Sequence, residues 1–255
     1  MTDDITNDIL VDRSDRVMTI TFNRPRQKNA LTHAMYATLA DSLEEADKDD
    51  TVRAILFTGA GDAFTAGNDL KDFMQPFPDG KPPVWRFLEN ILHAEKPIVS
   101  AVNGPAIGVG LTMLLHGDLS FASTAASFKA PFTLLGLVPE AASSLLLPRS
   151  IGTALANDIL MASRELTAEE ALAAGLVSRI YAPGELLAES RKAAETMANF
   201  APTAMRETKR LIRGDKKEIA ARMQEEAEIF NAQLRSPEFM ESAAAFMQKR
   251  APKFA

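Results

Sequence analysis

The order of short apolar segments along residues 9–180 constrains the fold most. Segments typical of β-strands recur, and segments with helical periodicity lie between most of them. The expected strands are 9–11, 17–22, 54–58, 98–102, 119–122 and 177–180. After Pro183 only helical patterns remain, at about 185–200, 202–213, 215–234 and 236–248. This order predicts an α/β protein with a helical C-terminal region.

Composition excludes several classes of protein. The 255 residues are 46% hydrophobic and 24% charged, which is ordinary for a globular chain that buries a sizeable core. The net charge of −6 argues against nucleic acid as the main partner. Cysteine is absent, so disulfides, a thiol nucleophile and a thiolate metal site are excluded. The three histidines lie far apart, without the spacing of metal ligands.

The chain carries no signal for a membrane or for secretion. The first eight residues are polar and acidic, unlike a secretory signal. The longest apolar run, around 105–115, is too short and too rich in glycine to span a bilayer. We therefore expect a cytoplasmic enzyme with neither a membrane nor a nucleic-acid partner.

Local signals place turns and helix ends. A hairpin is expected from residues 9–22, with its turn at 12–15. Thr32 is a candidate N-cap for a helix that continues to about Asp49. Four prolines make 73–83 an irregular loop, followed by a helix at about 84–94. A buried helix is expected from Gly108 to about His116, and another from Pro139 to about Leu147.

Two short backbone segments could approach a ligand. Ala66 and Gly67 follow a strand and a turn, and their small side chains permit close approach of the backbone. Val109 opens a helix, where backbone N–H groups lack helical partners. Taken singly, the first segment fits a tight turn, and the second fits plain helix packing, better than either fits a ligand site. Together, two N–H groups that converge on one oxygen would form an oxyanion hole.

Glu140 is the candidate for proton transfer. It follows Pro139 in the stretch 130–144, among apolar residues such as Phe132, Leu137 and Val138. Burial in such surroundings raises the pKa of a carboxyl group, which makes it a better base. From these residues alone, a carboxylate that only stabilises the start of a helix is also possible.

The stretches 64–72, 102–110 and 130–144 together resemble the crotonase family, the enoyl-CoA hydratases and isomerases, over about residues 8–250. The resemblance implies a spiral of repeated β-β-α units over 1–195. It also implies a C-terminal helical region, 196–255, used in trimer assembly. The substrate would be an acyl-CoA whose thioester oxygen binds the N–H groups of Ala66 and Val109. Coenzyme A would enter as part of the substrate, so no separate cofactor is expected.

The same resemblance distinguishes two branches of the family. Hydratases carry two glutamates, and this chain has Thr112 and Phe132 at those positions. Adding water needs one group to deprotonate water and another to protonate carbon, which neither residue can do. Glu140 instead matches the glutamate of peroxisomal-type Δ3,Δ2-enoyl-CoA isomerases. This match implies a single carboxylate that moves a proton from C2 to C4 while the double bond shifts from C3 to C2.

The resemblance also implies a set of substrate contacts: Lys28, Ala30, Gly67, Asn68, Asp69, Leu70, Gly108 and Phe132. Lys28 lies where the family contacts the adenine and phosphates, although a solvated surface lysine is nearly as compatible with its position. Asp69 is expected to hold the loop that presents Ala66. Four further residues could line an acyl tunnel or pack a core: Phe73, Met74, Phe77 and Trp85.

Two other functions remain open at this point. One is an enoyl-CoA hydratase, or another crotonase-type lyase or hydrolase. The other, from a different class, is an acyl-CoA-binding protein without catalysis. The direction of the Glu140 side chain distinguishes them, since a base must face the space below the oxyanion hole. Late apolar residues on the C-terminal helices, together with the resemblance, predict a homotrimer or a dimer of trimers: Phe230, Leu234, Phe239, Phe246 and Met247.

Overall fold

The computed structural model describes residues 7–74, 82–248 and 250–254. Its strands are β1 (Ile9–Ser14), β2 (Val17–Phe22), β3 (Ala54–Gly59), β4 (Ile98–Val102), β5 (Ala106–Ile107), β6 (Leu119–Ser123), β7 (Ser127–Lys129), β8 (Leu166–Thr167) and β9 (Arg179–Tyr181). Its first helices are α1 (His33–Lys48), α2 (Leu70–Phe73), α3 (Pro83–His93), α4 (Val109–Thr112), α5 (Ser143–Ile151), α6 (Thr153–Leu160) and α7 (Ala168–Ala173). The C-terminal helices are α8 (Pro183–Ala198), α9 (Pro202–Arg213), α10 (Lys216–Gln233) and α11 (Pro237–Met247). The 3-10 helices are η1 (Pro25–Gln27), η2 (Met113–His116) and η3 (Thr133–Leu135).

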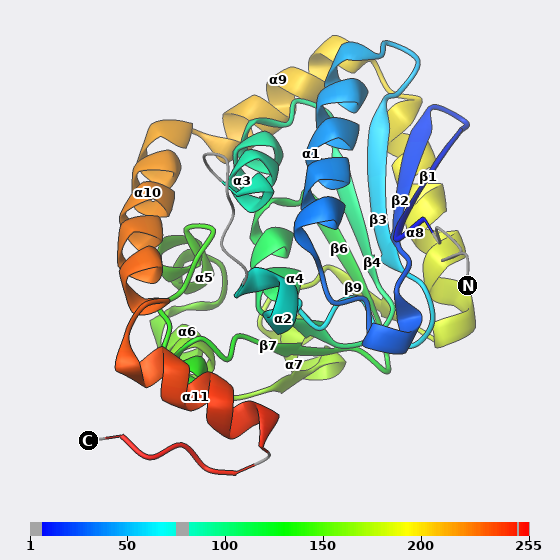
Figure 1. Cartoon of the computed structure of the whole chain (residues 1–255). Helices are drawn as coiled ribbons and strands as arrows, with labels where there is room; N and C mark the ends of the chain where they lie inside the picture. The colour runs from blue at the N-terminus through cyan, green and yellow to red at the C-terminus, as the bar shows by residue number, and fades with distance from the viewer. Residues whose placement is uncertain (1–6, 75–81, 249, 255) are drawn as a thin grey trace.

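Two sheets organise the chain (Figure 1). The larger has the strand order β1-β2-β3-β4-β6-β9, with an antiparallel β1–β2 pair and parallel pairs elsewhere. The smaller has the order β5-β7-β8. Strand β4 is buried along its whole length, which fits its apolar sequence, in which Ser100 is the one polar residue. The predicted α/β class with C-terminal helices is therefore confirmed.

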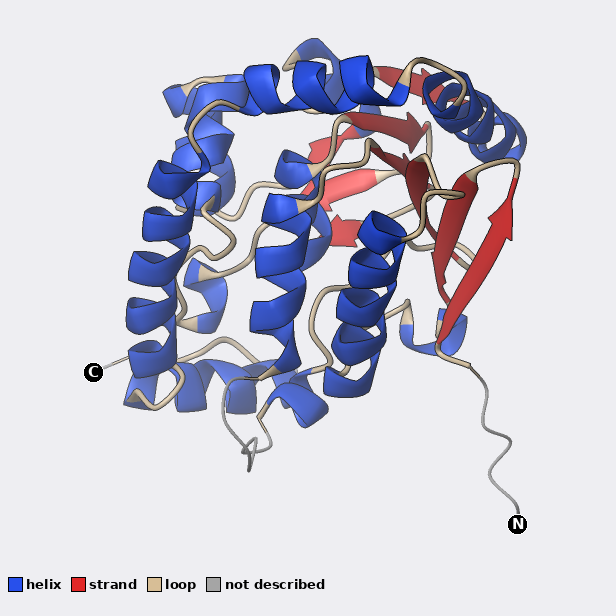
Figure 2. Ribbon diagram, turned by 90° about the horizontal axis from the view of Figure 1, so that it is seen from above, coloured by secondary structure: helices blue, strands red, loops and turns tan. Residues whose placement is uncertain are grey.

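Helices cover both faces of the larger sheet (Figures 1 and 2). On one face, α1 packs Met35, Leu39 and Leu43 into the main core. On the other face, α8 packs Leu186, Ala194 and Ala198 against a second core that includes Val17, Leu56 and Val99. The parallel strands are therefore buried on both sides, as parallel sheets require.

The N-terminal hairpin and the cap of α1 test two local predictions. Strand β1 continues to Ser14, so the predicted turn at 12–15 was placed too early. The turn lies at Asp15 and Arg16, whose φ angles of 52° and 65° fit a tight hairpin turn. The predicted cap is confirmed, since the Thr32 side chain accepts a hydrogen bond from the Met35 N–H.

Three other boundaries differ from the prediction. The helix expected from Pro139 begins only at Ser143, because Ala141 and Ala142 adopt left-handed backbone angles. The helix expected over 108–116 is divided into α4 and η2. Strands β5, β7 and β8 were not predicted, since segments of two or three residues carry no readable periodicity. Of the loop predicted over 73–83, residues 75–81, including Phe77, lie outside the described residues.

Truncating the core at α1 should destabilise the fold. Leu39 is fully buried, so Leu39→Ala should lower the free energy of unfolding by about 2–5 kcal/mol. Leu10 is 43% exposed, so Leu10→Ala should change it by about 0.5 kcal/mol or less. Urea unfolding followed by circular dichroism measures both. Equal effects of the two substitutions would contradict the assignment of α1 to the core.

Candidate active site

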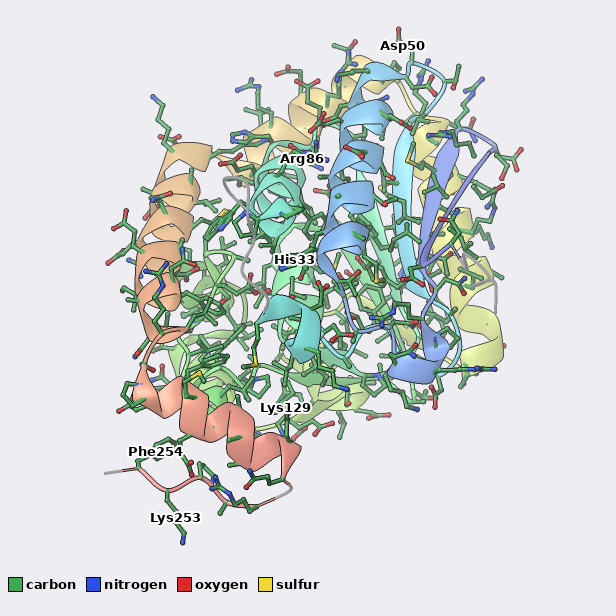
Figure 3. The ribbon with its side chains drawn as sticks, viewed as in Figure 1. His33, Asp50, Arg86, Lys129, Lys253 and Phe254 are labelled. Atoms are coloured by element: carbon green, nitrogen blue, oxygen red, sulfur yellow. The ribbon has the colours of Figure 1, made fainter. Side chains whose placement is uncertain are left out.

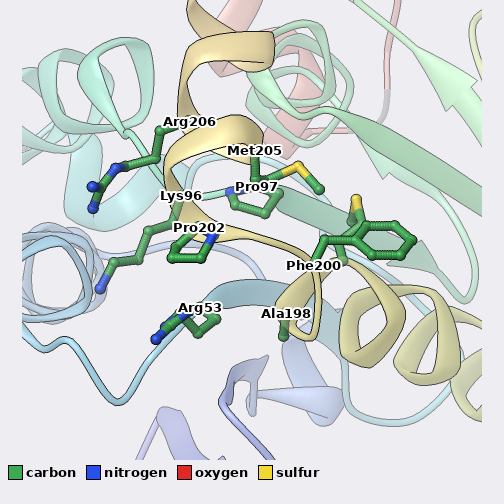
Figure 4. Close-up of a pocket in the computed structure, with 9 residues that line it drawn as sticks. Arg53, Lys96, Pro97, Ala198, Phe200, Pro202, Met205 and Arg206 are labelled. Atoms are coloured by element: carbon green, nitrogen blue, oxygen red, sulfur yellow. The ribbon is translucent and has the colours of Figure 1, made fainter.

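One large cavity is lined by residues from distant parts of the chain. Its volume is about 520 Å³, within the usual range for a small-molecule site. Its lining is mostly apolar and comprises Gln27, Ala30, Ala66, Gly67, Asn68, Asp69, Leu70, Lys71, Met74, Ile107, Gly108, Val109, Pro131, Phe132, Leu134, Leu135, Leu137, Phe230, Phe239, Ala243 and Met247. By contrast, the pocket in Figure 4, between Lys96, Phe200 and Arg206, holds only about 20 Å³, room for a water molecule.

The cavity wall is built where two backbone segments touch. The Thr65 N–H donates to the Pro105 carbonyl (3.1 Å), and the Ile107 N–H donates to the Thr65 carbonyl (3.0 Å). A Cβ atom at Gly67 would lie 2.9 Å from the Ile107 carbonyl oxygen, so no side chain fits there. Gly67 also has a φ of 87°, which favours glycine. These contacts bring the predicted segments 66–67 and 107–109 together.

The structure corrects one predicted oxyanion-hole donor. The Ala66 N–H donates to the Lys28 carbonyl (2.9 Å), so it is not free for a ligand. Asn68 forms a parallel bridge with Leu31, in which the Asp69 N–H donates to the Leu31 carbonyl (2.8 Å). Within the described residues, the Asn68 N–H donates to no acceptor, and Asn68 lines the cavity. Asn68 therefore replaces Ala66 as the candidate donor.

Val109 fits its predicted place. Gly108 precedes α4 with φ 57° and ψ −119°, backbone angles that strongly favour glycine. As the first residue of α4, Val109 has no helical acceptor for its N–H, which donates no hydrogen bond within the described part of the chain. Because Asn68 and Val109 both line the cavity on touching segments, their N–H groups are the candidate pair for one substrate oxygen.

Glu140 lies just outside the lining residues and is held by α4. The Thr112 hydroxyl donates a hydrogen bond to Glu140 Oε1, and Thr112 is fully buried. Burial raises the pKa of Glu140 to about 7; the Thr112 hydrogen bond opposes this rise, and the negative charge of Glu226 adds to it. The sequence indicated Thr112 only as a position where hydratases carry a glutamate, and the structure adds its contact with Glu140.

A buried tyrosine connects the carboxylate to the candidate oxyanion hole. The Tyr36 hydroxyl donates to Asn68 Oδ1 (2.5 Å). Burial raises the pKa of Tyr36, and the charge of Glu140 raises it further. Tyr36, Asn68, Thr112 and Glu140 therefore lie in one neighbourhood. Helix α1 begins at His33, labelled in Figure 3, whose N–H donates to the Asp72 carboxylate of α2 (2.6 Å).

The other predicted contacts divide into two groups. Ala30, Gly67, Asp69, Leu70, Gly108 and Phe132 all line the cavity. Asp69 also caps α2 and forms an ion pair with Arg24 (3.1 Å), as expected of a residue that holds the loop. The Lys28 ammonium instead pairs with Asp62 at the surface (2.6 Å) and is not among the lining groups. Its contact with coenzyme A stays a prediction.

Among the described residues, no cluster of three or more His, Asp or Glu side chains could hold a metal ion. Over the same ranges, no helix is long and apolar enough to cross a bilayer.

The raised pKa of Glu140 predicts a pH-dependent stability. Its pKa is about 7 in the fold and 4.5 as the ordinary value, so the folded state binds more protons between these pH values. The free energy of unfolding therefore falls as pH rises through this window. Glu140→Gln removes the cost of burying a charged carboxylate. The stability of this variant relative to the parent should therefore be about 1–3 kcal/mol greater at pH 8 than at pH 4. Urea unfolding at both pH values measures the difference, and a pH-independent difference would contradict the raised pKa.

Known proteins match the chain along nearly its whole length. A family model described as enoyl-CoA hydratase/isomerase matches residues 12–255. Enoyl-CoA delta isomerase 2 of Rattus norvegicus is 37% identical over 250 residues, which cover 95% of this chain but only 64% of that relative. The 2,3-dehydroadipyl-CoA hydratase of Escherichia coli is 33% identical over 255 residues, covering 97% of this chain and 98% of the relative.

One solved structure is closely similar to the structure of this chain. The enoyl-CoA hydratase/isomerase from Pseudoalteromonas atlantica is 56% identical, has a TM-score of 0.95, and is matched over 97% of this chain and 100% of its own. Sequence and structure therefore place this chain in the enoyl-CoA hydratase/isomerase family, with the crotonase fold.

Proposed function

We propose that the protein is an enoyl-CoA isomerase that moves a double bond from C3 to C2, with Glu140 as its base. The observation that carries the proposal is a partly buried carboxylate with a pKa of about 7 that accepts a hydrogen bond from Thr112 of α4, the helix that begins with Val109. A base whose pKa lies near the working pH combines adequate ionisation with proton affinity. The similarity to the rat enoyl-CoA delta isomerase supports the same reaction.

In the proposed mechanism, backbone N–H groups stabilise the developing charge and the Glu140 side chain transfers the proton. The thioester oxygen accepts hydrogen bonds from the Asn68 and Val109 N–H groups, which stabilise the negative charge that develops there. Glu140 removes a proton from C2, and the electron pair delocalises over the thioester and the C3–C4 double bond as a dienolate. The protonated Glu140 then delivers the proton to C4, which leaves the double bond at C2–C3 and regenerates the carboxylate.

Hydration is the competing reaction, favoured by the full-length similarity to the Escherichia coli hydratase. Adding water needs two proton-transfer groups. Asp69 is the one acidic residue among the described lining residues. Its carboxylate forms an ion pair with Arg24 and caps the start of α2. Phe132 lines the cavity where hydratases carry a glutamate, and Thr112 bonds to Glu140. The binding-only alternative is disfavoured because Glu140 is held inside the structure by Thr112.

Glu140→Gln should abolish most isomerase turnover. The amide keeps the shape of the side chain but cannot accept the C2 proton, so kcat should fall by about 10²–10⁴-fold. Binding of a saturated acyl-CoA should change little, because backbone N–H groups recognise the thioester. Glu169→Gln is the matched control, an exposed glutamate on α7. The assay offers 3-enoyl-CoA and 2-enoyl-CoA separately and identifies each product.

Three results of that assay would reject the proposal. A Gln variant that isomerises 3-enoyl-CoA at nearly the parent rate would exclude Glu140 as the base. A parent enzyme that converts 2-enoyl-CoA to the 3-hydroxyacyl product faster than it isomerises 3-enoyl-CoA would be a hydratase. A protein that binds acyl-CoA and converts neither substrate would be a binding module.

We also propose that the chain assembles as a homotrimer or a pair of trimers. Within one chain, Phe230, Phe239 and Ala243 of α10 and α11 already line the cavity. Other apolar side chains stay exposed, namely Leu211, Ile212 and Met240. A closed ring would bury them. Light scattering at micromolar concentration should give three or six times the 27.7-kDa chain mass, and a monomer would reject the assembly.

A further inference from the structure

The turn that carries Glu140 is strained. The next two residues, Ala141 and Ala142, have φ angles of 58° and 55°, in the left-handed region. Side chains with a Cβ atom disfavour this region, and two such residues in succession are held only when their surroundings fix them. Helix α5 begins directly afterwards, and Ala142, at its N-cap, offers no side-chain acceptor to the first N–H groups of the helix.

The missing hydrogen-bond acceptors are the carboxylate oxygens of Glu226 on α10, which lies 84 residues after Ala142 in the sequence. Its Oε2 accepts a hydrogen bond from the Ala142 N–H (2.6 Å), and its Oε1 accepts one from the Ser144 N–H (2.9 Å). The side chain is only 5% exposed. Both carboxylate oxygens are thus used on the turn. Burial raises the pKa of Glu226, and the two N–H donors oppose this rise.

A second contact holds the turn from the opposite side. His116 Nε2 lies 2.8 Å from the Ala141 carbonyl oxygen. Burial lowers the pKa of His116 to about 4, so the ring is neutral at working pH. Because a carbonyl oxygen only accepts, Nε2 must carry the ring proton and donate it to this bond. The segment 141–144 is therefore clamped between η2 and α10.

We propose that Glu226 is a positioning residue for the reaction at Glu140: its carboxylate holds the strained turn that sets the place of the Glu140 carboxylate. The inference rests on the proposed function for its effect on turnover. Glu226 does not line the cavity, so it acts through the turn and not by touching substrate.

The charge of Glu226 gives the proposal a signature that a purely structural role lacks. Four groups face the turn and Glu140: Tyr36 from α1, His116 from η2, and Glu226 and Arg222 from α10. Tyr36 and His116 are uncharged at working pH, and Arg222 pairs with Glu225 (3.1 Å). Glu226 remains as the anion that raises the pKa of Glu140. Neutralising it should therefore lower that pKa.

The test compares Glu226→Gln with Glu228→Gln, which removes an exposed glutamate from the same helix. In Glu226→Gln, the acidic limb of the kcat/KM profile should move down by about half a pH unit or more. At pH 8, kcat should fall about tenfold or more, because a misplaced base reacts slowly. KM and the Kd of a saturated acyl-CoA should stay within about twofold, since the cavity lining is unchanged. Glu228→Gln should match the parent throughout.

A second readout does not depend on turnover. Protein labelled with carboxyl-¹³C glutamate gives a Glu140 signal, assigned by its absence in Glu140→Gln. Its titration midpoint should fall in Glu226→Gln and stay in Glu228→Gln. If Glu140 proves not to be the isomerase base, this shift in its titration still tests whether Glu226 acts on Glu140. Failure of the proposed function and failure of the positioning role are therefore distinguishable.

The proposal is overturned by an unshifted Glu140 titration in Glu226→Gln, or by an equal shift in Glu228→Gln. A kcat of Glu226→Gln equal to that of the parent, despite a shifted Glu140 titration, would also overturn it. The contact of Glu226 with the turn would then not affect turnover. If Glu226→Gln does not fold, the double variant with Ala142→Gly replaces it, because glycine accepts a φ of 55° without strain. The same outcomes then apply, measured against Ala142→Gly alone.

Discussion

The close backbone contact between residues 62–67 and 104–110 is the constraint on which the site depends. A Cβ atom at Gly104 would lie 2.1 Å from the Asp62 carbonyl oxygen, and one at Gly110 would lie 2.6 Å from the Thr65 methyl group. With Gly67, three glycines thus allow two loops to touch without intervening side chains. The approach brings the Asn68 and Val109 N–H groups to one cavity wall, while the N–H groups of Ala66 and Gly108 donate to backbone carbonyls and that of Gly67 donates to the Thr65 hydroxyl.

Around this contact, the fold keeps two acidic side chains in unfavourable surroundings. Burial raises the pKa of Glu140 and of Glu226, so each would be more stable in solvent. Glu226 is compensated by the N–H groups of Ala142 and Ser144. Among the described residues, Glu140 accepts a side-chain hydrogen bond only from the Thr112 hydroxyl, and its pKa is raised to about 7 by burial. The difference in hydrogen bonding separates a carboxylate that holds structure from one suited to exchanging protons.

The sequence predicted the elements of the site better than their local register. Strong periodicity located β3, β4, α1 and the C-terminal helices, and the motif around Glu140 indicated a segment that the structure brings into contact with Thr112 of α4. The candidate oxyanion donor shifted from Ala66 to Asn68 because the Ala66 N–H donates to the Lys28 carbonyl, whereas the bridge to Leu31 uses the Asp69 N–H and not that of Asn68. Glu226 lay in an ordinary amphipathic helix, and nothing local to it indicates a contact 84 residues away. Such pairings exist only after the chain folds.

A backbone oxyanion hole leaves the reaction to be decided by a few side chains around it. The N–H groups of Asn68 and Val109 would persist after most substitutions, so the identity of the nearby acids selects the chemistry. Here Thr112 is already engaged as the hydrogen-bond donor to Glu140. A glutamate at 112 would therefore not simply restore a hydratase, since it would remove that donor and place a second carboxylate against Glu140. Like charges at that distance raise the pKa of at least one acid and keep it protonated. Under the proposed mechanism, the isomerase pattern is a coupled arrangement of Thr112 and Glu140 that no single substitution reverses.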